Sequence, residues 1–117
     1  MLMPAGVEVF VATTPVDLRY GFARLAGIAT EQLSRDARSG ALFVFFGKRR
    51  TSVKVLFANR TGMCVFYKRL DRGTFRIPEQ LDPNATHIAV TERALDDLLD
   101  GIDVEPAKAS ARTRRVH

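Results

Sequence analysis

Tryptophan is absent from this chain of 117 residues, which also contains only one cysteine and two histidines. A single cysteine, Cys64, excludes an intramolecular disulfide and a thiolate cluster that could bind zinc. Cys64 lies in an apolar run, where a free cysteine is usually a small core residue. The two histidines do not form a pair, because His87 opens an expected strand and His117 is the last residue. We therefore expect no metal site.

Long apolar runs are also missing. No run approaches the ~20 residues of a membrane helix. The first ten residues, MLMPAGVEVF, lack the charged start and long apolar stretch of a signal peptide. Hydrophobic residues make up 46% of the chain and charged residues 26%, as in ordinary globular proteins. We expect a cytoplasmic protein without a membrane partner, with one domain over residues 1–105 and a basic, disordered tail over 106–117.

Catalytic signatures are missing as well. Metal-dependent strand transfer needs several carboxylates that converge on metal ions. Here Asp96, Asp97 and Asp100 stand beside leucines, as on the solvated face of a helix. No motif supports a Ser-His-Asp or Cys-His arrangement, and no glycine-rich phosphate loop is present. We therefore expect no enzymatic activity and no cofactor, and an enzyme of unrecognised type ranks last among the candidate functions.

Positive charge, by contrast, is abundant and concentrated. Nine of the eighteen basic residues lie between Lys48 and Arg76, with Asp71 as the only acid among them. Residues 77–105 hold eight acids and one basic residue, and 106–117 hold four basic residues. A concentrated basic segment is the electrostatic signature of a protein that binds a polyanion, most often a nucleic acid. The simpler alternative is a solvated surface that maintains solubility.

The apolar pattern predicts an α+β fold with an antiparallel meander of four to six strands. The connectors within the basic segment contain the glycine, asparagine and aspartate of tight turns, which join antiparallel neighbours. The expected strands are 7–14, 41–47, 52–58, 63–70, 74–77 and 87–90.

Two helices are expected, over about 15–34 and 91–101. Thr14-Pro15-Val16-Asp17 has the residues of a helix start, and apolar residues then recur at three- and four-residue steps. Thr91 precedes a second apolar stripe that ends near Gly101. Because each helix has one apolar stripe, each needs one packing surface.

Four stretches of the chain together resemble a known family. They are VDLRYGFARLAG (16–27), GALFVFFGKRRTSVKVLF (40–57), GMCVFYKRLDRGTFRIP (62–78) and LDDLLDGID (95–103). Over residues 7–103 the chain is similar to TnpB, the accessory protein encoded by the second reading frame of insertion sequences of the sixty-six type. That family is distinct from the RNA-guided nuclease of the same name. The resemblance implies a role in transposition beside a separate, larger transposase, and it implies no mechanism.

The candidate nucleic-acid-binding residues are the cations of the turns and of the strands beside them. Arg49 and Arg50 belong to one turn and Arg72 to a second, and two strands separate these turns. The turns should therefore lie at the same end of the sheet. Lys68 and Arg69 are adjacent in a strand, so their side chains should point to opposite faces. The complete set is Lys48, Arg49, Arg50, Lys68, Arg69, Arg72 and Arg76, with Arg19 and Tyr67 as secondary candidates.

Arg19 and Tyr67 each have two interpretations. Arg19 either touches phosphate from the start of the first helix or pairs with an acid across the fold while Asp17 serves the helix terminus, and we favour the second. Tyr67 is the aromatic residue best suited to stack on a base, because it adjoins two cations and its hydroxyl tolerates water. Most phenylalanines are expected in the core.

Two functions from different classes compete. The first is a non-catalytic accessory factor of transposition that binds DNA, with weak sequence specificity, through a basic surface of sheet and turns. The alternative is a protein-interaction module that docks on the transposase and contacts no DNA. A strong salt dependence of duplex binding would favour the first. The sequence leaves the DNA site and the oligomeric state open.

Overall fold

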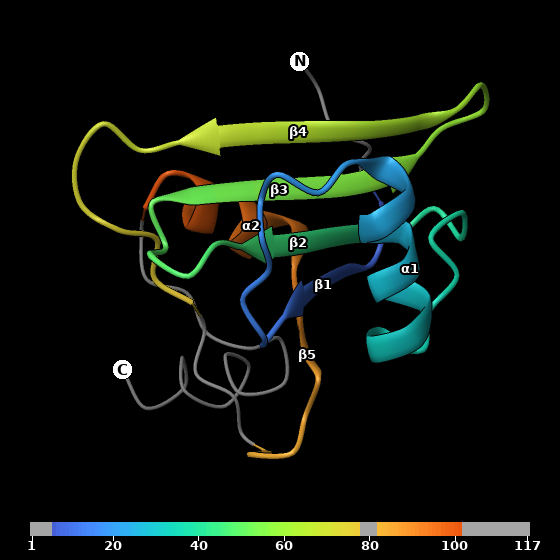
Figure 1. Cartoon of the computed structure of the whole chain (residues 1–117), viewed down its shortest axis with the longest axis horizontal. Helices are drawn as coiled ribbons and strands as arrows, with labels where there is room; N and C mark the ends of the chain where they lie inside the picture. Colours follow the sequence, from blue (N-terminus) through green and yellow to red (C-terminus); the bar gives the residue numbers. More distant parts are fainter. Residues whose placement is uncertain (1–5, 78–81, 102–117) are drawn as a thin grey trace.

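A five-stranded sheet with one helix on each face forms the centre of the computed structural model, which describes residues 6–77 and 82–101 (Figure 1). The strands are β1 (Val9–Ala12), β2 (Leu42–Phe46), β3 (Ser52–Ala58), β4 (Met63–Arg69) and β5 (His87–Val90). The helices are α1 (Phe22–Leu33) and α2 (Glu92–Leu99). In space the strands follow the order β4-β3-β2-β1-β5.

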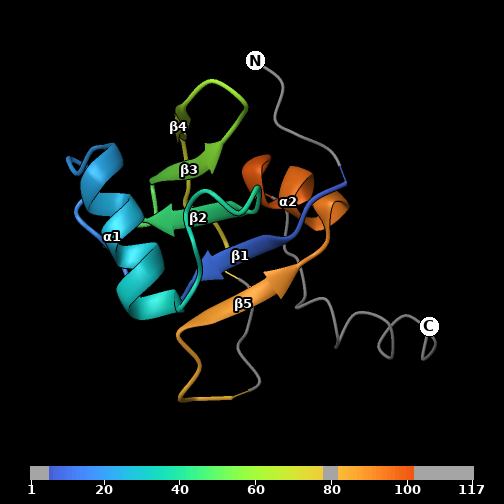
Figure 2. The same ribbon diagram turned by 90° about the vertical axis from the view of Figure 1, so that its right-hand side faces the viewer.

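Apolar side chains on both faces of the sheet divide the core into two layers. Figure 2 shows α1 and α2 on opposite sides of the sheet. Phe10, Phe43 and Phe45 pack with α1, whereas Val11 and Val44 pack with α2. Every residue of β1 and β2 is buried. This explains why VFVA and LFVFF are apolar throughout, as is typical of strands that are covered on both faces.

The predicted α+β fold is confirmed, and β2, β3 and β4 form the expected antiparallel meander. β5 pairs antiparallel with β1. The pairing of β1 with β2 differs from the expectation, because these two strands are parallel, with Val9 opposite Leu42 and Val11 opposite Val44. The reason is the long connection between them. This connection contains α1 and returns the chain to the end of the sheet at which β1 begins, as a parallel pair requires.

The predicted second helix is confirmed, and the first is shorter than expected. Thr91 caps α2, because its side-chain oxygen accepts a hydrogen bond of 3.0 Å from the N–H of Ala94. α1 begins at Phe22 and not near residue 15. The carbonyl oxygen of Asp17 accepts a hydrogen bond of 3.0 Å from the N–H of Tyr20 in a turn, and Gly21 is extended. Residues 14–21 therefore lie outside the helix.

The expected strand over 74–77 is wrong. Phe75 is only 1% exposed, and its ring centroid lies 5.6 Å from that of Phe46 in the core layer beneath α2. The chain after β4 turns beneath the end of the sheet, where Phe75 fills the core, and does not return alongside β4. The expected domain limit at residue 105 and the expected tail over 106–117 lie outside the described residues.

Replacing Phe75 with alanine should destabilise the protein by about 3–5 kcal/mol, because it opens a cavity in the core. The matched control is Phe22→Ala, since the Phe22 side chain is 52% exposed and its loss should cost under about 1 kcal/mol. The free energy of unfolding in urea, followed by circular dichroism, measures both. Equal losses in the two variants would contradict the anchoring role of Phe75.

Candidate nucleic-acid interface

Three consecutive cations stand in the turn between β2 and β3. Lys48, Arg49 and Arg50 are all exposed. The N–H of Arg50 donates a hydrogen bond of 3.0 Å to the carbonyl oxygen of Gly47. Arg50 has a φ of 58°, in the left-handed region that few non-glycine residues adopt. Because they are exposed, the three side chains are accessible to a ligand.

The segment after β4 lies directly against this turn. The N–H of Leu70 donates to the carbonyl oxygen of Thr51 at 2.9 Å, and the N–H of Phe75 donates to that of Arg50 at 2.7 Å. The exposed Arg72 lies between these two contacts in the chain. The prediction that the two basic turns share one end of the sheet is therefore confirmed.

A third segment, residues 13–21, crosses the same end of the sheet. The N–H of Val16 donates a hydrogen bond of 2.9 Å to the carbonyl oxygen of Phe46, the last residue of β2. Lys54 holds the far part of the segment, because its ammonium donates to the carbonyl oxygen of Tyr20 at 2.9 Å. Leu18 lies so close to Gly47 that a Cβ there would be 3.2 Å from Leu18 Cδ1. A side chain at position 47 would therefore require Leu18 to shift.

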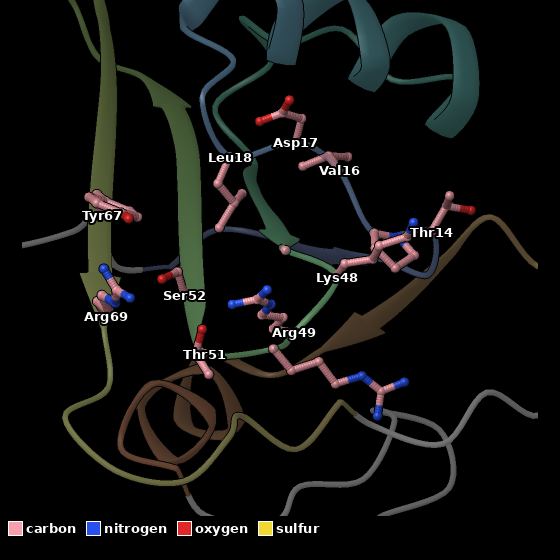
Figure 3. Close-up of a pocket in the computed structure, with 13 residues that line it drawn as sticks. Thr14, Val16, Asp17, Leu18, Lys48, Arg49, Thr51, Ser52, Tyr67 and Arg69 are labelled. Atoms are coloured by element: carbon pink, nitrogen blue, oxygen red, sulfur yellow. The ribbon is translucent and has the colours of Figure 1, made fainter.

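These segments and the end of β4 enclose a pocket of about 740 Å³ (Figure 3). Residues 14–18 form one side of it, the turn after β2 forms a second, and β4 contributes Tyr67 and Arg69. The lining residues are Thr14, Pro15, Val16, Asp17, Leu18, Gly47, Lys48, Arg49, Arg50, Thr51, Ser52, Tyr67 and Arg69. Three regions that are distant in sequence therefore meet at one site.

The electrostatics of the pocket are strongly one-sided. Four cations line it, against one acid, Asp17. Asp17 is already paired, because its carboxylate lies 2.6 Å from the guanidinium of Arg19. Hydrogen bonds from the guanidinium and the backbone N–H of Arg19 lower the pKa of Asp17 from 3.8 to about 2. Asp17 therefore remains ionised at neutral pH, and its charge is balanced by Arg19.

The four lining cations differ from Asp17 in having no charged partner among the residues that the structure describes. Across residues 6–77 and 82–101, no carboxylate forms a salt bridge with Lys48, Arg49, Arg50 or Arg69. Unpaired cations around a concave surface raise the local concentration of anions. The arrangement is suited to binding phosphate groups, since arginine presents several N–H donors to them at once.

The remaining candidates lie in different environments. The prediction that Lys68 and Arg69 face opposite sides of the sheet is confirmed. The ammonium of Lys68 donates to the carbonyl oxygen of Leu99 at 2.8 Å, at the end of α2, and lies 3.9 Å from the carboxylate of Asp100. Arg76 is exposed and does not line the pocket. Arg19 pairs with Asp17, two residues away, and not with an acid across the fold.

Sequence reasoning missed the wall formed by residues 14–18 and the role of Lys54. The available signal was Gly21, which interrupts the apolar stripe at the point where α1 begins. Within the described ranges, no three His, Cys, Asp or Glu residues are placed to hold a metal ion. None of the described helices is long and apolar enough to span a membrane.

Comparison with known proteins identifies the family. The sequence model described as "IS66 Orf2 like protein" matches residues 7–109. The chain belongs to the IS66 Orf2-like family. Membership confirms the resemblance drawn from the sequence and links the chain to insertion sequences and to an accessory role in transposition. The IS66 Orf2-like family is not a known enzyme family.

Two chains similar to this IS66 Orf2-like protein come from Sinorhizobium fredii (strain NBRC 101917 / NGR234). "Uncharacterized protein y4hO" is 37% identical over 117 residues, which cover 98% of this chain and 99% of the relative. "Uncharacterized protein y4jC" is 34% identical over 98 residues, which cover 84% of this chain and 81% of the relative. No solved structure matches the chain.

The positive φ of Arg50 in the turn after β2 can be tested by substitution. Arg50→Gly should be more stable than Arg50→Ala by about 1 kcal/mol, because glycine adopts a positive φ without the steric cost of a Cβ atom. Both variants lose the same side chain, so their difference isolates the backbone. Urea unfolding followed by circular dichroism measures it. If Arg50→Ala is as stable as Arg50→Gly, the left-handed conformation of residue 50 is incorrect.

Proposed function

We propose that this IS66 Orf2-like protein binds DNA as an accessory factor of transposition, acting beside a separate transposase. The observation that supports the proposal best is the set of unpaired cations around one pocket. Lys48, Arg49, Arg50 and Arg69 line it without a carboxylate partner among the described residues. The adjacent Arg72 extends the same surface.

The chemistry of the surface favours contacts with the phosphate backbone over the reading of bases. Its cations stand on turns and at the end of a strand, and neither described helix presents a basic face. α2 carries Asp96 and Asp97, its C-cap is Asp100, and it packs on the face of the sheet opposite α1. Proteins that read sequence commonly place a helix or a two-stranded ribbon in the major groove. Phosphate contacts fix the position of a protein on DNA and carry no sequence information themselves, so binding should be weakly sequence-specific.

The surface also divides the cations into those that serve the fold and those that are available to a ligand. Lys68 holds the end of α2 and Lys54 holds the crossing segment. Replacement of either would therefore change the structure as well as the charge. Within the part of the chain that the structure describes, the side chains of Arg49 and Arg69 form no hydrogen bond. They reach the pocket from two different segments, the turn after β2 and the end of β4, which makes them the informative residues to replace.

Duplex binding should weaken steeply with salt. If about five side chains meet phosphates, log K against log salt concentration should have a slope near −4 to −5. Arg49→Ala/Arg69→Ala should lower the affinity by about 1–3 kcal/mol at low salt and reduce the slope by nearly two. Fluorescence anisotropy with labelled duplexes at several salt concentrations measures both quantities.

The control for this experiment is Arg38→Ala/Arg60→Ala, which removes the same charge from exposed positions outside the pocket. Its effect on affinity should be clearly smaller. A flat salt response, or no binding at low salt, would remove DNA from the proposed function. If the Arg49/Arg69 variant binds duplex DNA normally but no longer binds the transposase, the protein is an interaction module instead.

A substitution of Asp17 should raise the affinity for duplex DNA, whereas the arginine substitutions should lower it. Asp17→Asn removes the one acid that lines the pocket among the described residues, and it releases Arg19, whose side chain is 91% exposed. Duplex affinity at low salt should rise several-fold, and the salt slope should steepen by about one, because one more cation can meet a phosphate. Glu31→Gln, at an exposed position of α1, is the control for the change in net charge. Unchanged or weaker binding by Asp17→Asn, measured by anisotropy, would place the DNA elsewhere on the protein.

A further inference from the structure

Tyr67 presents an unusual apolar surface inside the basic pocket. Its side chain is 55% exposed, and among the described residues only Phe22 is another large apolar side chain with comparable exposure. The other phenylalanines with a described environment are mostly buried in the two core layers. Tyr67 belongs to β4, an edge strand whose far side has no neighbour in the sheet. The ring therefore lines the pocket without being covered by the fold.

The wall across from Tyr67 is also apolar. Figure 3 shows Leu18 and Val16 across the pocket from Tyr67 and Arg69, with Arg49 reaching in from the turn. Lys54 lies beside Tyr67, with its ammonium 5.4 Å from the centre of the ring. The site thus combines an aromatic ring, an apolar floor and cations at the rim. A nucleotide has the matching parts, which are a flat base that stacks and a phosphate that carries negative charge.

The size of the pocket restricts what can enter it. A volume of about 740 Å³ lies in the range of pockets that hold a single small molecule. A duplex keeps its bases stacked and paired, so that only their edges are accessible in the grooves. Proteins that accept a whole base in a pocket take it from a single strand or flip it out of the duplex. The rim of this pocket can meet duplex phosphates, whereas of the parts of a DNA strand its interior suits an unpaired base and not a base pair within a duplex.

We propose that the pocket receives one unpaired nucleotide of a DNA strand, with the base against the ring of Tyr67 and the adjoining phosphates on Arg49 and Arg69. The proposal rests on the proposed DNA-binding function and adds to it a preference for DNA that has unpaired bases, such as a frayed or recessed end. The aromatic contact is tolerant of sequence, because every base has a face that can stack.

The test compares two DNA probes that have equal numbers of phosphates. Both consist of the same duplex with a three-nucleotide single-stranded overhang, and in one probe the overhang positions are abasic. Because the phosphates are equal, a difference in affinity reports the bases alone. The wild-type protein should bind the probe with bases about tenfold more tightly. Equal affinity for the two probes would overturn the proposal.

Variants of Tyr67 identify the contact. Tyr67→Phe keeps the ring and should retain the tenfold preference, whereas Tyr67→Leu keeps the bulk without the aromatic face and should lose it. Phe22→Ala removes an exposed aromatic side chain outside the pocket lining and should behave as wild type. Circular dichroism verifies that each variant is folded. A preference that survives in Tyr67→Leu would place the base elsewhere and overturn the proposal.

Two further arms separate this proposal from other outcomes. Free deoxynucleoside monophosphates should bind at least tenfold more weakly than a short single strand, and equal binding would make the site one for free nucleotides and overturn the assignment to a DNA strand. The abasic probe tests the proposed function by itself. If it binds with a salt dependence that Arg49→Ala/Arg69→Ala reduces while the bases add nothing, the DNA-binding function stands and only the unpaired-nucleotide proposal fails.

Discussion

β1 and β2 lie side by side and parallel in the middle of the sheet, and this pairing determines where the rest of the chain can run. Antiparallel strands can be joined by a tight turn, but parallel strands need a connecting segment that returns the chain to the end of the sheet at which the first strand began. Residues 13–41 make this return, and their first part crosses the end of the sheet at which β2 also ends. The turn after β2 starts at that same end. The pocket between them is therefore a direct product of the parallel pair.

Because successive side chains of a strand point to opposite faces of the sheet, adjacent basic residues of β4 have different surroundings. Lys68 and Arg69 are neighbours in sequence, yet one side chain reaches the last carbonyl groups of α2 and the other lines the pocket. A cation at the C-terminus of a helix is favourable, because the helix dipole is negative there. α2 packs on the opposite face of the sheet from α1 through Leu95, Leu98 and Leu99. The fold thus directs two cations that are adjacent in sequence to opposite faces of the sheet.

Much of this fold could be predicted from local patterns, since β3, β4, β5 and α2 follow from alternation, turn residues and a helix cap. Three features could not be, because tertiary contacts override local preference. Asp17 has the chemistry of a helix start, but it forms a turn and an ion pair with Arg19. Phe75 sits in an apparent strand and fills the core. The direction of β1 depends on the path of the whole crossover. Likewise, the cations of the site could be identified from the sequence, whereas the position of residues 14–18 as one wall of the pocket could not.

The pocket is assembled from residues 14–18, 47–52 and the end of β4, so it exists only when these segments are folded together. The unfolded chain carries the same cations, but it spreads them along its length. Mass action then requires that any anion bound in the pocket stabilise the native state, by about 2.7 kcal/mol when its concentration is one hundred times its dissociation constant. Conversely, the mutual repulsion of these cations lowers the stability of the folded protein when no anion is bound. Thermodynamic linkage therefore means that any ligand bound at this site also stabilises the folded chain.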